Sequence, residues 1–297
     1  MTHSRKVTVE APAKVNLTLE VLGRREDGYH EIASVMQAIS LFDTLTFSLA
    51  DGLKVITDVP GLDTSDNLVY RAAMLLRQAT GVPAGAAIRL SKEIPLAAGL
   101  GGGSSDAAAT LLGLNRLWQL RLSEDRLKDM AAQLGSDVPF FLRGGTALVE
   151  GRGEQVTIVK APPTLWLLLA FPSHRLENKT ATAYKALNSA EHTDGLRTTN
   201  LVSRIEGAAD IGRDSLFNVF DGVAPRLFPG IDRVSSILQE VCGAPAHLSG
   251  AGPTLFCPVD GPEQGERALG ECAERGLDCR LVRTLVPEEG PRISAGE

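Results

Sequence analysis

The sequence predicts an α+β fold, in which strands and helices occupy separate stretches of the chain. Two observations favour this class. Apolar residues alternate with polar ones through much of the first fifty or so positions, which is the pattern of half-buried strands. Later segments carry apolar residues at helical spacing and end at glycine or proline. A doubly wound α/β sheet would instead require strands and helices in regular alternation.

The N-terminal segment is expected to be mainly strand. Alternating apolar residues over 7–11 and again over 15–21 indicate strands. Residues 23–28 carry charges between two glycines and therefore predict a loop. A mostly apolar pattern returns over 32–47 and predicts a further strand near its end.

Two amphipathic helices are expected in the middle of the chain. The first spans 67–79 and is stopped by Gly81 and Pro83. The second is capped by Ser123 and closed by Gly135.

The pair Pro162-Pro163 predicts a boundary between two domains, 1–161 and 162–297, because consecutive prolines stop regular structure. Beyond it we expect a buried strand, about sixty residues of helices and loops, two strands flanking the turn SGAGPT, a helix and a final strand. These strands and the helix are placed at 165–171, 247–248, 255–259, 263–275 and 279–285. The polar tail from Glu288 is expected to be frayed.

Composition excludes several classes of protein. A chain of 297 residues with 43% hydrophobic and 22% charged residues is typical of a globular protein. A net charge of −6 argues against general nucleic-acid binding. The longest apolar run, 165–171, is too short to cross a membrane, and the N-terminus lacks an apolar signal core, so we expect a cytoplasmic protein without a membrane partner. The four cysteines, Cys242, Cys257, Cys272 and Cys279, lack metal-ligand spacing and are expected to be reduced and buried.

The most informative segment is PLAAGLGGGSSDAAA, residues 95–109, where four glycines lead into two serines and an alanine-rich helix. We expect Ser104 or Ser105 to be the N-cap of this helix. A glycine loop that ends at a helix N-terminus offers free N–H groups and the positive end of the helix dipole, and both attract phosphate. An ordinary glycine-rich turn is the alternative.

Two familiar phosphate loops do not match this segment. A Walker loop requires a lysine after the last glycine, and a dinucleotide fingerprint requires glycine where Ser104 stands. The segment resembles instead the P-x-x-x-G-L-G-S-S motif of the GHMP kinases, such as galactokinase, homoserine kinase and mevalonate kinase. The additional glycines are similar to one branch, which acts on 4-diphosphocytidyl-2-C-methyl-D-erythritol in non-mevalonate isoprenoid synthesis.

A second motif, LGSDVPFF at 134–141, contains the candidate catalytic base. Asp137 lies between a helix end and Pro139, which is expected to start a short helix, so Asp137 alone could be a cap. The motif resembles the family's L-G-x-D-V-P, whose aspartate takes the proton from the substrate hydroxyl.

A third motif, PAKVNL at 12–17, places Lys14 and Asn16 on one side of a strand. A single strand lysine is usually solvated. The motif nevertheless resembles the family's opening motif, in which the lysine lies beside the aspartate and offsets charge on the transferred phosphoryl group. The resemblance implies that Asn16 binds substrate.

A fourth motif, DGYHEI at 27–32, resembles the substrate-binding part of this branch. The resemblance implies that Tyr29 stacks on cytosine and His30 hydrogen-bonds its edge. Thr180 and Tyr184, in NKTATAY, match a threonine and an aromatic residue of the family, although a core helix would carry the same pattern. Met36 stands where relatives often have phenylalanine, a departure that bears on substrate packing.

The resemblance implies ATP binding by the glycine segment and by Asn67, which could equally be only a helix N-cap. The full set is Pro95, Leu96, Ala97, Ala98, Gly99, Leu100, Gly101, Gly102, Gly103, Ser104, Ser105 and Asn67. The turn SGAGPT either is a simple hairpin or, as in the family, faces the active site. The histidines at 3, 174, 192 and 247 form no sequence cluster with acidic residues and are assigned no chemistry.

The GHMP resemblance implies a fold of two α+β domains. The first would be like ribosomal protein S5 domain 2, the second ferredoxin-like, with the active site in the cleft between them. It implies ATP and Mg²⁺ as cofactors and a cytidine diphosphate-linked alcohol as substrate. The metal ligand stays open, since Asp106 beside phosphates would repel them unless it turned away or met the metal. A sister kinase acting on mevalonate or homoserine, and a nucleotide-binding protein without catalysis, are the alternatives.

Overall fold

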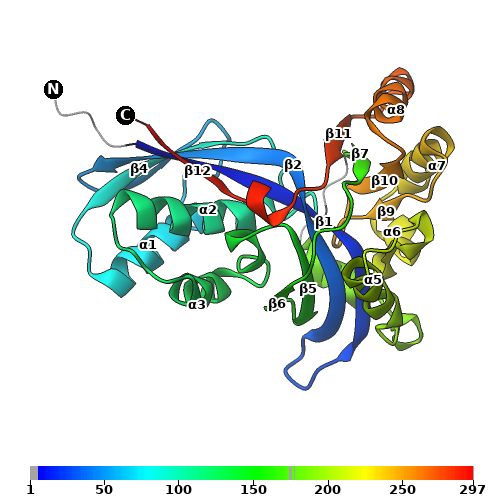
Figure 1. Cartoon of the computed structure of the whole chain (residues 1–297), viewed down its shortest axis with the longest axis horizontal. Coiled ribbons are helices and arrows are strands. Elements are labelled where there is room, and N and C mark those ends of the chain that lie inside the picture. Colours follow the sequence, from blue (N-terminus) through cyan, green and yellow to red (C-terminus); the bar gives the residue numbers. More distant parts are fainter. Residues whose placement is uncertain (1–5, 174–175, 177, 297) are drawn as a thin grey trace.

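The computed structural model describes residues 6–173, 176 and 178–296. Within these residues the strands form two sheets, one of eight strands and one of four (Figure 1). Three helices, α1 (Leu68–Thr80), α2 (Gly102–Leu117) and α3 (Glu124–Leu134), pack together with the first sheet. The helices α7 (Ile231–Cys242) and α8 (Pro262–Glu274) pack on the second. The α+β class is therefore confirmed.

A long antiparallel hairpin of β1 (Lys6–Arg24) and β2 (His30–Ala50) is the centre of the first sheet. The strand patterns expected at its start form one continuous strand, because register shifts absorb the irregular positions. Pro12, which cannot donate a backbone hydrogen bond, lies at the first of these shifts. The hairpin places Lys14 and Asn16 at its middle and Tyr29 at its tip.

Four further strands of the first sheet extend the hairpin on the β2 side. They are β3 (Leu53–Ile56), β4 (Gly85–Ser91), β5 (Thr146–Gly151) and β6 (Gln155–Ile158). The helix cap predicted at Ser123 is confirmed, and Asn67 makes the cap that was an alternative to its ATP-binding role. Asn67 Oδ1 accepts from the Val69 N–H at the start of α1, and Ser123 Oγ accepts from Arg126 at the start of α3.

The start of α2 differs from the prediction. Its N-cap is Gly101, in the left-handed region at φ 73°, and the helix already begins at Gly102. Ser105 lies one turn inside and donates its hydroxyl to the Pro12 carbonyl at 2.7 Å. The serine cap was wrong because glycine can adopt the left-handed turn that starts the helix earlier. No side chain caps this end, so the N–H groups of the first turn remain available to a ligand.

The second sheet has the order β11-β7-β10-β9, with all neighbours antiparallel. Its strands, β7 (Trp166–Ala170), β9 (His247–Leu248), β10 (Leu255–Val259) and β11 (Cys279–Arg283), confirm the predicted positions. The four cysteines are buried in this half, as expected. Between β7 and β9 the chain forms mainly helices, also as expected. These are α4 (Lys179–Ala186), α5 (Leu196–Glu206), α6 (Ala224–Leu227) and the 3₁₀ turns Ser189–Glu191, Arg213–Ser215 and Val219–Gly222. Elsewhere in the described chain, 3₁₀ turns are formed by Phe140–Leu142 and Pro287–Glu289.

Two segments beyond Pro162-Pro163 join the first sheet. The short strand β8 (Phe217–Asn218) runs parallel to the middle of β1, and β12 (Arg292–Gly296) pairs antiparallel with its first five residues. The expectation of a frayed tail was therefore wrong. Backbone groups form the β1–β12 ladder, so a polar tail can pair without an apolar pattern.

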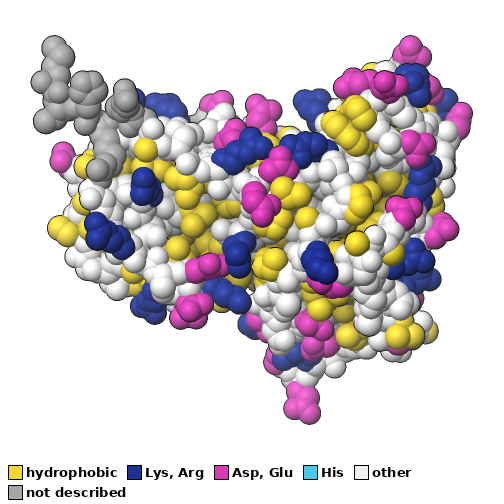
Figure 2. Space-filling model, viewed as in Figure 1, with side chains coloured by type: hydrophobic (Ala, Val, Ile, Leu, Met, Phe, Trp, Pro, Cys, Tyr) yellow, Lys and Arg dark blue, Asp and Glu magenta, His cyan; other side chains and the backbone are white. Residues whose placement is uncertain are grey.

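The two sheets also share part of one hydrophobic core. A buried cluster joins Ala13, Val15 and Leu17 of β1 to Leu167 and Leu169 of β7, so the long hairpin packs against the second sheet as well as the first. On the face seen in Figure 2, cationic and anionic side chains are interspersed, and neither sign dominates. Among the described residues no helix has both the length and the apolar character that crossing a bilayer requires.

Candidate active site

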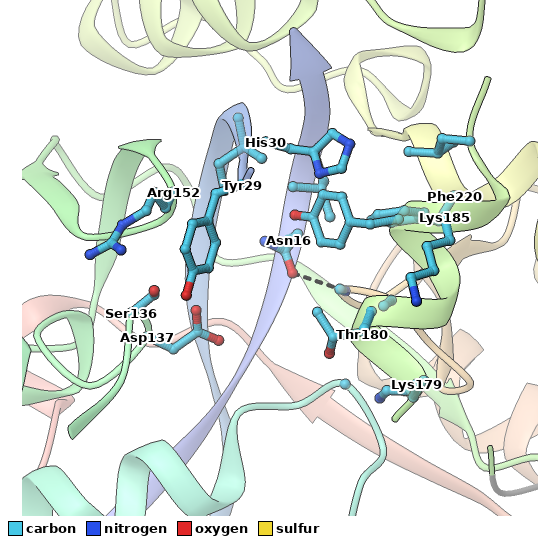
Figure 3. Close-up of a pocket in the computed structure, with 18 of the residues that line it drawn as sticks. Asn16, Tyr29, His30, Ser136, Asp137, Arg152, Lys179, Thr180, Lys185 and Phe220 are labelled. Carbon is cyan, nitrogen blue, oxygen red and sulfur yellow. Dashed lines mark hydrogen bonds between the residues drawn. The ribbon is translucent and has the colours of Figure 1, made fainter. Parts of the chain in front are cut away.

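A cavity of about 1100 Å³ is lined by residues from both halves of the chain. Figure 3 shows Tyr29, Ser136, Asp137 and Arg152 on one side, Lys179, Thr180, Lys185 and Phe220 on the other, and Asn16 between them. All seven predicted catalytic and substrate-binding residues line it: Lys14, Asn16, Tyr29, His30, Asp137, Thr180 and Tyr184. Met36 also lines this cavity.

Lys14, Asn16 and Asp137 form a connected polar group in this cavity. Lys14 Nζ donates to Asn16 Oδ1 at 2.6 Å and lies 3.8 Å from Asp137 Oδ2. Asn16 Nδ2 in turn donates to the Ser34 hydroxyl at 2.8 Å, which fixes the orientation of the amide. The prediction that Lys14 and Asn16 share one side of the strand is confirmed.

The environments of Lys14 and Asp137 are unequal. The side chain of Lys14 is 4% exposed and that of Asp137 is 33% exposed. Burial lowers the pKa of Lys14 below its ordinary value, and the nearby Asp137 opposes this effect. Asp137 follows α3, just before Pro139, which starts the 3₁₀ turn as predicted; that turn has no side-chain cap. The carboxylate therefore faces the lysine and the cavity instead of a helix end.

The aromatic residues lie toward the tip of the β1–β2 hairpin. The rings of His30 and Tyr184 stack, with centroids 4.8 Å apart, so His30 covers one face of the tyrosine. Tyr29 is 57% exposed, and the guanidinium of Arg152 lies 4.9 Å from the centre of its ring. Burial lowers the pKa of His30, and His192 and Arg24 lower it further. The imidazole is thus held in its neutral form, which can both donate and accept hydrogen bonds.

A smaller cavity of about 280 Å³ lies along the glycine loop. Eleven of the twelve predicted ATP-binding residues line it: Asn67, Pro95, Leu96, Ala97, Ala98, Gly99, Leu100, Gly101, Gly102, Gly103 and Ser104. Ser105 does not, because its hydroxyl is turned to Pro12. Gly99, Gly101 and Ser104 line the large cavity as well, so the two cavities meet at this loop.

The turn SGAGPT, residues 249–254, holds the glycine loop from the second half of the chain. Ser249 Oγ donates to the Gly99 carbonyl at 2.9 Å, and the Thr254 N–H donates to the Ala98 carbonyl at 3.2 Å. A Cβ on Gly99 would lie 2.2 Å from the Ser249 carbonyl oxygen, so only glycine fits this approach. The Gly250 N–H also donates to Asn16 Oδ1 at 2.9 Å. The turn therefore joins β9 to β10 and also contacts both the glycine loop and Asn16.

A buried charged group lies beneath the glycine loop. Lys92 contacts the carboxylates of Asp43 and Asp106, and its Nζ lies 2.7 Å from Asp106 Oδ2. Asp43 contacts Lys92 through Oδ2, and its Oδ1 accepts hydrogen bonds from the Glu93 and Ile94 N–H groups. Asp106 Oδ1 is buried without a hydrogen-bond partner. Burial raises the pKa of Asp106 to about 7, against the opposing effect of Lys92.

Sequence reasoning missed several residues of these cavities. Four cations, Arg24, Arg152, Lys179 and Lys185, line the large cavity, and Lys92 lines the smaller one. Lys179 and Lys185 flank the predicted Thr180 and Tyr184, so a reading of the whole segment would have included them. For Lys92 and Arg152 no periodic or motif signal was available, because the fold alone brings them to the site.

The assignment of the histidines needs correction. His247 Nδ1 lies 2.8 Å from Asp221 Oδ2, so this histidine does pair with an acidic residue. His192 lines the large cavity, edge-on to His30 at 6.2 Å. Tertiary contacts created both arrangements, which sequence spacing could not reveal. His3 and His174 lie outside the described residues.

Comparison with known proteins gives consistent matches. The family model described as GHMP kinases N terminal domain matches residues 67–145. A 4-diphosphocytidyl-2-C-methyl-D-erythritol kinase of Pelotomaculum thermopropionicum is 45% identical over 286 residues, 95% of this chain and 99% of the relative. One from Symbiobacterium thermophilum is 44% identical over 284 residues, covering 94% and 99%. A crystal structure of 4-(cytidine 5'-diphospho)-2C-methyl-D-erythritol kinase superimposes with a TM-score of 0.80 at 34% identity, covering 93% of this chain and 98% of that one.

Proposed function

Because this chain belongs to the 4-diphosphocytidyl-2-C-methyl-D-erythritol kinases, a branch of the GHMP kinase superfamily, we propose that it transfers the γ-phosphoryl group of ATP to the 2-hydroxyl of 4-diphosphocytidyl-2-C-methyl-D-erythritol. One observation carries the assignment of roles. Lys14 and Asp137 lie 3.8 Å apart in a cavity that meets the glycine loop at one end and holds the DGYH aromatics at the other. Donor, acceptor and base can therefore lie in one space.

Asp137 is the proposed general base. Its partly exposed carboxylate can accept the proton of the attacking hydroxyl while Lys14 compensates the charge that develops on the phosphoryl group. Asn16 holds Lys14 through Oδ1 and so keeps the ammonium directed toward the reaction. Phosphoryl transfer depends mainly on such positioning and charge compensation, and the site supplies both.

The glycine loop is the proposed site of the triphosphate. The uncapped first turn of α2 directs its N–H groups and helix dipole toward the smaller cavity, where an anion is favoured. Asn67, which caps α1 through Oδ1, also lines that cavity and is proposed to lie near the base or ribose of ATP. We propose that the cleft between an S5-like first domain and a ferredoxin-like second domain holds both substrates. The order β11-β7-β10-β9 supports the ferredoxin-like assignment.

The residues beside the glycine loop are compatible with Mg²⁺. Mg²⁺ in kinases is held mostly by phosphates and water, with one or two protein carboxylates. Asp106 lines the smaller cavity and has one carboxylate oxygen without a partner, so Asp106 is the proposed protein ligand. When bound, the ion neutralises charge on the β- and γ-phosphates.

The cytidine base is proposed to bind at the hairpin tip, between Tyr29 and the His30–Tyr184 pair. A base stacked on an aromatic ring gains roughly 1–3 kcal/mol, and the neutral His30 can read a base edge. Thr180 and the cations Arg152 and Lys185 also line the cavity and are proposed to contact the diphosphate of this substrate.

A substrate panel tests this function. The purified protein is assayed for ATP-dependent phosphorylation of 4-diphosphocytidyl-2-C-methyl-D-erythritol, its uridine counterpart, mevalonate and homoserine. The cytidine compound should be preferred by kcat/KM, because the uridine carbonyl replaces an amine donor and leaves buried polar groups unpaired. Equal turnover of both nucleosides would contradict the cytosine pocket. Preference for mevalonate or homoserine would indicate a sister kinase, and absence of any ATP turnover would indicate a binding protein.

A further inference from the structure

Lys179, the first residue of α4, joins two loops of the active site. Its Nζ donates to the Ala97 carbonyl at 2.8 Å, at the start of the glycine loop, and to the Gly252 carbonyl in the turn SGAGPT. Figure 3 shows it beside Thr180, across the cavity from Asp137. The helix of Thr180 and Tyr184 is thereby tied to the phosphate loop.

This position is electrostatically unfavourable for a cation in the absence of ligand. The side chain lies at the N-terminus of a helix, where the helix dipole repels positive charge. Its two hydrogen-bond partners are neutral carbonyls, and the positive charge of Lys14 is close enough to lower the pKa of Lys179. An ammonium has three donors, so one remains after the two carbonyls are bound. An anion that arrived beside it would relieve all of these unfavourable effects.

We propose that Lys179 binds an oxygen of the γ-phosphate of ATP and is a second cation on the transferred phosphoryl group, in addition to Lys14. This inference rests on the kinase function proposed above. In the reaction the phosphorus–oxygen bond to ADP breaks, the bond to the substrate oxygen forms and the proton passes to Asp137. Lys179 forms no covalent bond and keeps its proton.

The location favours the γ-phosphate over the diphosphate of the other substrate. The two carbonyls that hold Nζ belong to the glycine loop and to the turn that clamps it. The cations nearer the aromatic residues are different ones: Arg152 stacks on Tyr29, and Lys185 follows Tyr184 directly on α4. Lys179 is thus on the nucleotide side of the cavity.

The protonation of Lys179 supports the same role. Burial and the neighbouring Lys14 lower its pKa to about 8. Besides Lys14, the other titratable side chains that line the cavity are Arg24, Tyr29, His30, Asp137, Arg152, Tyr184, Lys185 and His192. Lys179 is therefore mainly charged at pH 7 and loses its charge as the pH rises through about 8. A bound phosphate would raise the pKa again, so nucleotide affinity should fall at alkaline pH.

The experiment compares Lys179→Met and Lys179→Arg with the wild type. Calorimetry measures the affinity for ADP and for the β,γ-imido analogue of ATP, and kinetics give kcat and both KM values. Loss of a hydrogen bond between charged groups corresponds to about 10- to 100-fold. Lys179→Met should weaken binding of the analogue by that factor, change the affinity for ADP by less than about threefold and lower kcat. Lys179→Arg should retain most of the affinity for the analogue and most of kcat. Lys128→Met, on the exposed face of α3, removes one surface cation as a control.

The outcomes separate this inference from its alternatives. Wild-type affinity for the analogue should decline above about pH 8, and in Lys179→Arg the decline should move to higher pH. Equal weakening of ADP and the analogue would assign Lys179 only to the shape of the loop, and a rise confined to the KM of the cytidine substrate would place it on the other diphosphate. Either result, or unchanged binding, overturns the inference. If Lys179→Met unfolds, the pH profile of Lys179→Arg decides. Failure of the wild type to phosphorylate the cytidine compound would refute the kinase function, while the nucleotide-binding comparison would still stand.

Discussion

Asn16 illustrates how one side chain can connect the β1–β2 hairpin to the second half of the chain. Its Oδ1 accepts from Lys14 Nζ at 2.6 Å and from the Gly250 N–H at 2.9 Å. The donors come from β1 and from the turn SGAGPT, so the lysine and the turn take their positions from the same atom. Asp137 then meets a lysine that is already fixed, which lowers the cost of ordering the pair during the reaction.

The role of Asp137 can be tested by Asp137→Asn. The amide keeps the shape of the side chain but cannot accept the proton, so kcat should fall by about 10² to 10⁴ with normal folding. Lys14→Ala should also reduce kcat strongly, and the double variant should lose much less than the product of the two effects, because the pair acts as a unit. Steady-state kinetics measure kcat of each variant, and a thermal melt measures whether it folds normally. Retention of more than half of wild-type kcat in Asp137→Asn would assign the carboxylate a structural role.

A pH dependence should follow from His30. Its pKa is lowered from the ordinary 6.5, chiefly by burial, so the ring is mainly neutral at and above that pH and gains its charge below it. The KM for the cytidine substrate should therefore be constant from about pH 7.5 to 6.5 and rise only in more acidic buffer. His30→Gln, which keeps a polar edge without titrating, is the matched control and should remove the acidic rise. A wild-type KM that increases as the pH is raised above 6.5 would instead show that the substrate binds the charged ring.

At the scale of elements, the glycines at the start of α2 have different reasons to be glycine. Gly101 has φ 73° and a Cβ there would lie 2.6 Å from Phe141, so it is required by the fold. Gly103 is helical, and a Cβ there would meet only Leu68 Cδ1, at 3.8 Å. No close contact within the described protein requires glycine at 103, so this position can test whether the proposed phosphate site needs the space.

This contrast can be tested with two alanine variants. Gly101→Ala should destabilise the protein by about 1–3 kcal/mol because of the left-handed conformation and the contact with Phe141. Gly103→Ala should be neutral or stabilising by up to about 1 kcal/mol, since alanine favours helix. It should nevertheless weaken ATP binding, because the methyl group lies where phosphate meets the backbone. Urea unfolding and calorimetry separate the two effects. Unchanged nucleotide affinity in Gly103→Ala would exclude the first turn of α2 as the phosphate site.

Most helices and strands could be predicted from sequence because their signals are local. The caps Asn67 and Ser123, the strand at 166–170 and the pair of strands around SGAGPT all follow from short patterns. The start of α2 and strand β12 could not, since the first depends on glycine backbone angles and the second on a partner at the other end of the chain. Likewise the motif residues Lys14 and Asp137 were found, whereas Lys92 reaches the site only through tertiary contacts.

At the scale of the whole molecule, the first and last strands of the described chain pair with each other. Residues 292–296 form the edge of the first sheet against residues 6–10 of β1, where Val7 and Val9 are buried. The candidate active-site residues Lys14 and Asn16 lie further along β1, beyond the register shift at Pro12. The ladder is thus expected to contribute to stability more than to catalysis.

Truncation after Pro291 tests this division. Loss of β12 should lower Tm, by about 2–4 °C for each kcal/mol in a chain of this size, while kcat and both KM values at 25 °C stay close to wild type. Calorimetric melting and kinetics measure the two properties. Substitution of Ile293, which is 45% exposed, by threonine keeps the backbone ladder and is the control for side-chain effects. An unchanged Tm would show that the ladder is dispensable, and a large fall in kcat would connect it to the site.

The clamp of the turn SGAGPT on the glycine loop also determines when the protein becomes competent during synthesis. The hydrogen bond from Ser249 to Gly99 joins residues 150 positions apart. When the glycine loop leaves the ribosome, the residues that hold its carbonyls have not yet been made. Local helices form early, whereas contacts so distant in sequence form late. A nascent chain that has folded only strands β1–β6 of the first sheet is therefore expected to lack a finished site for phosphate, and ATP binding is expected only after the second sheet has been translated and docked.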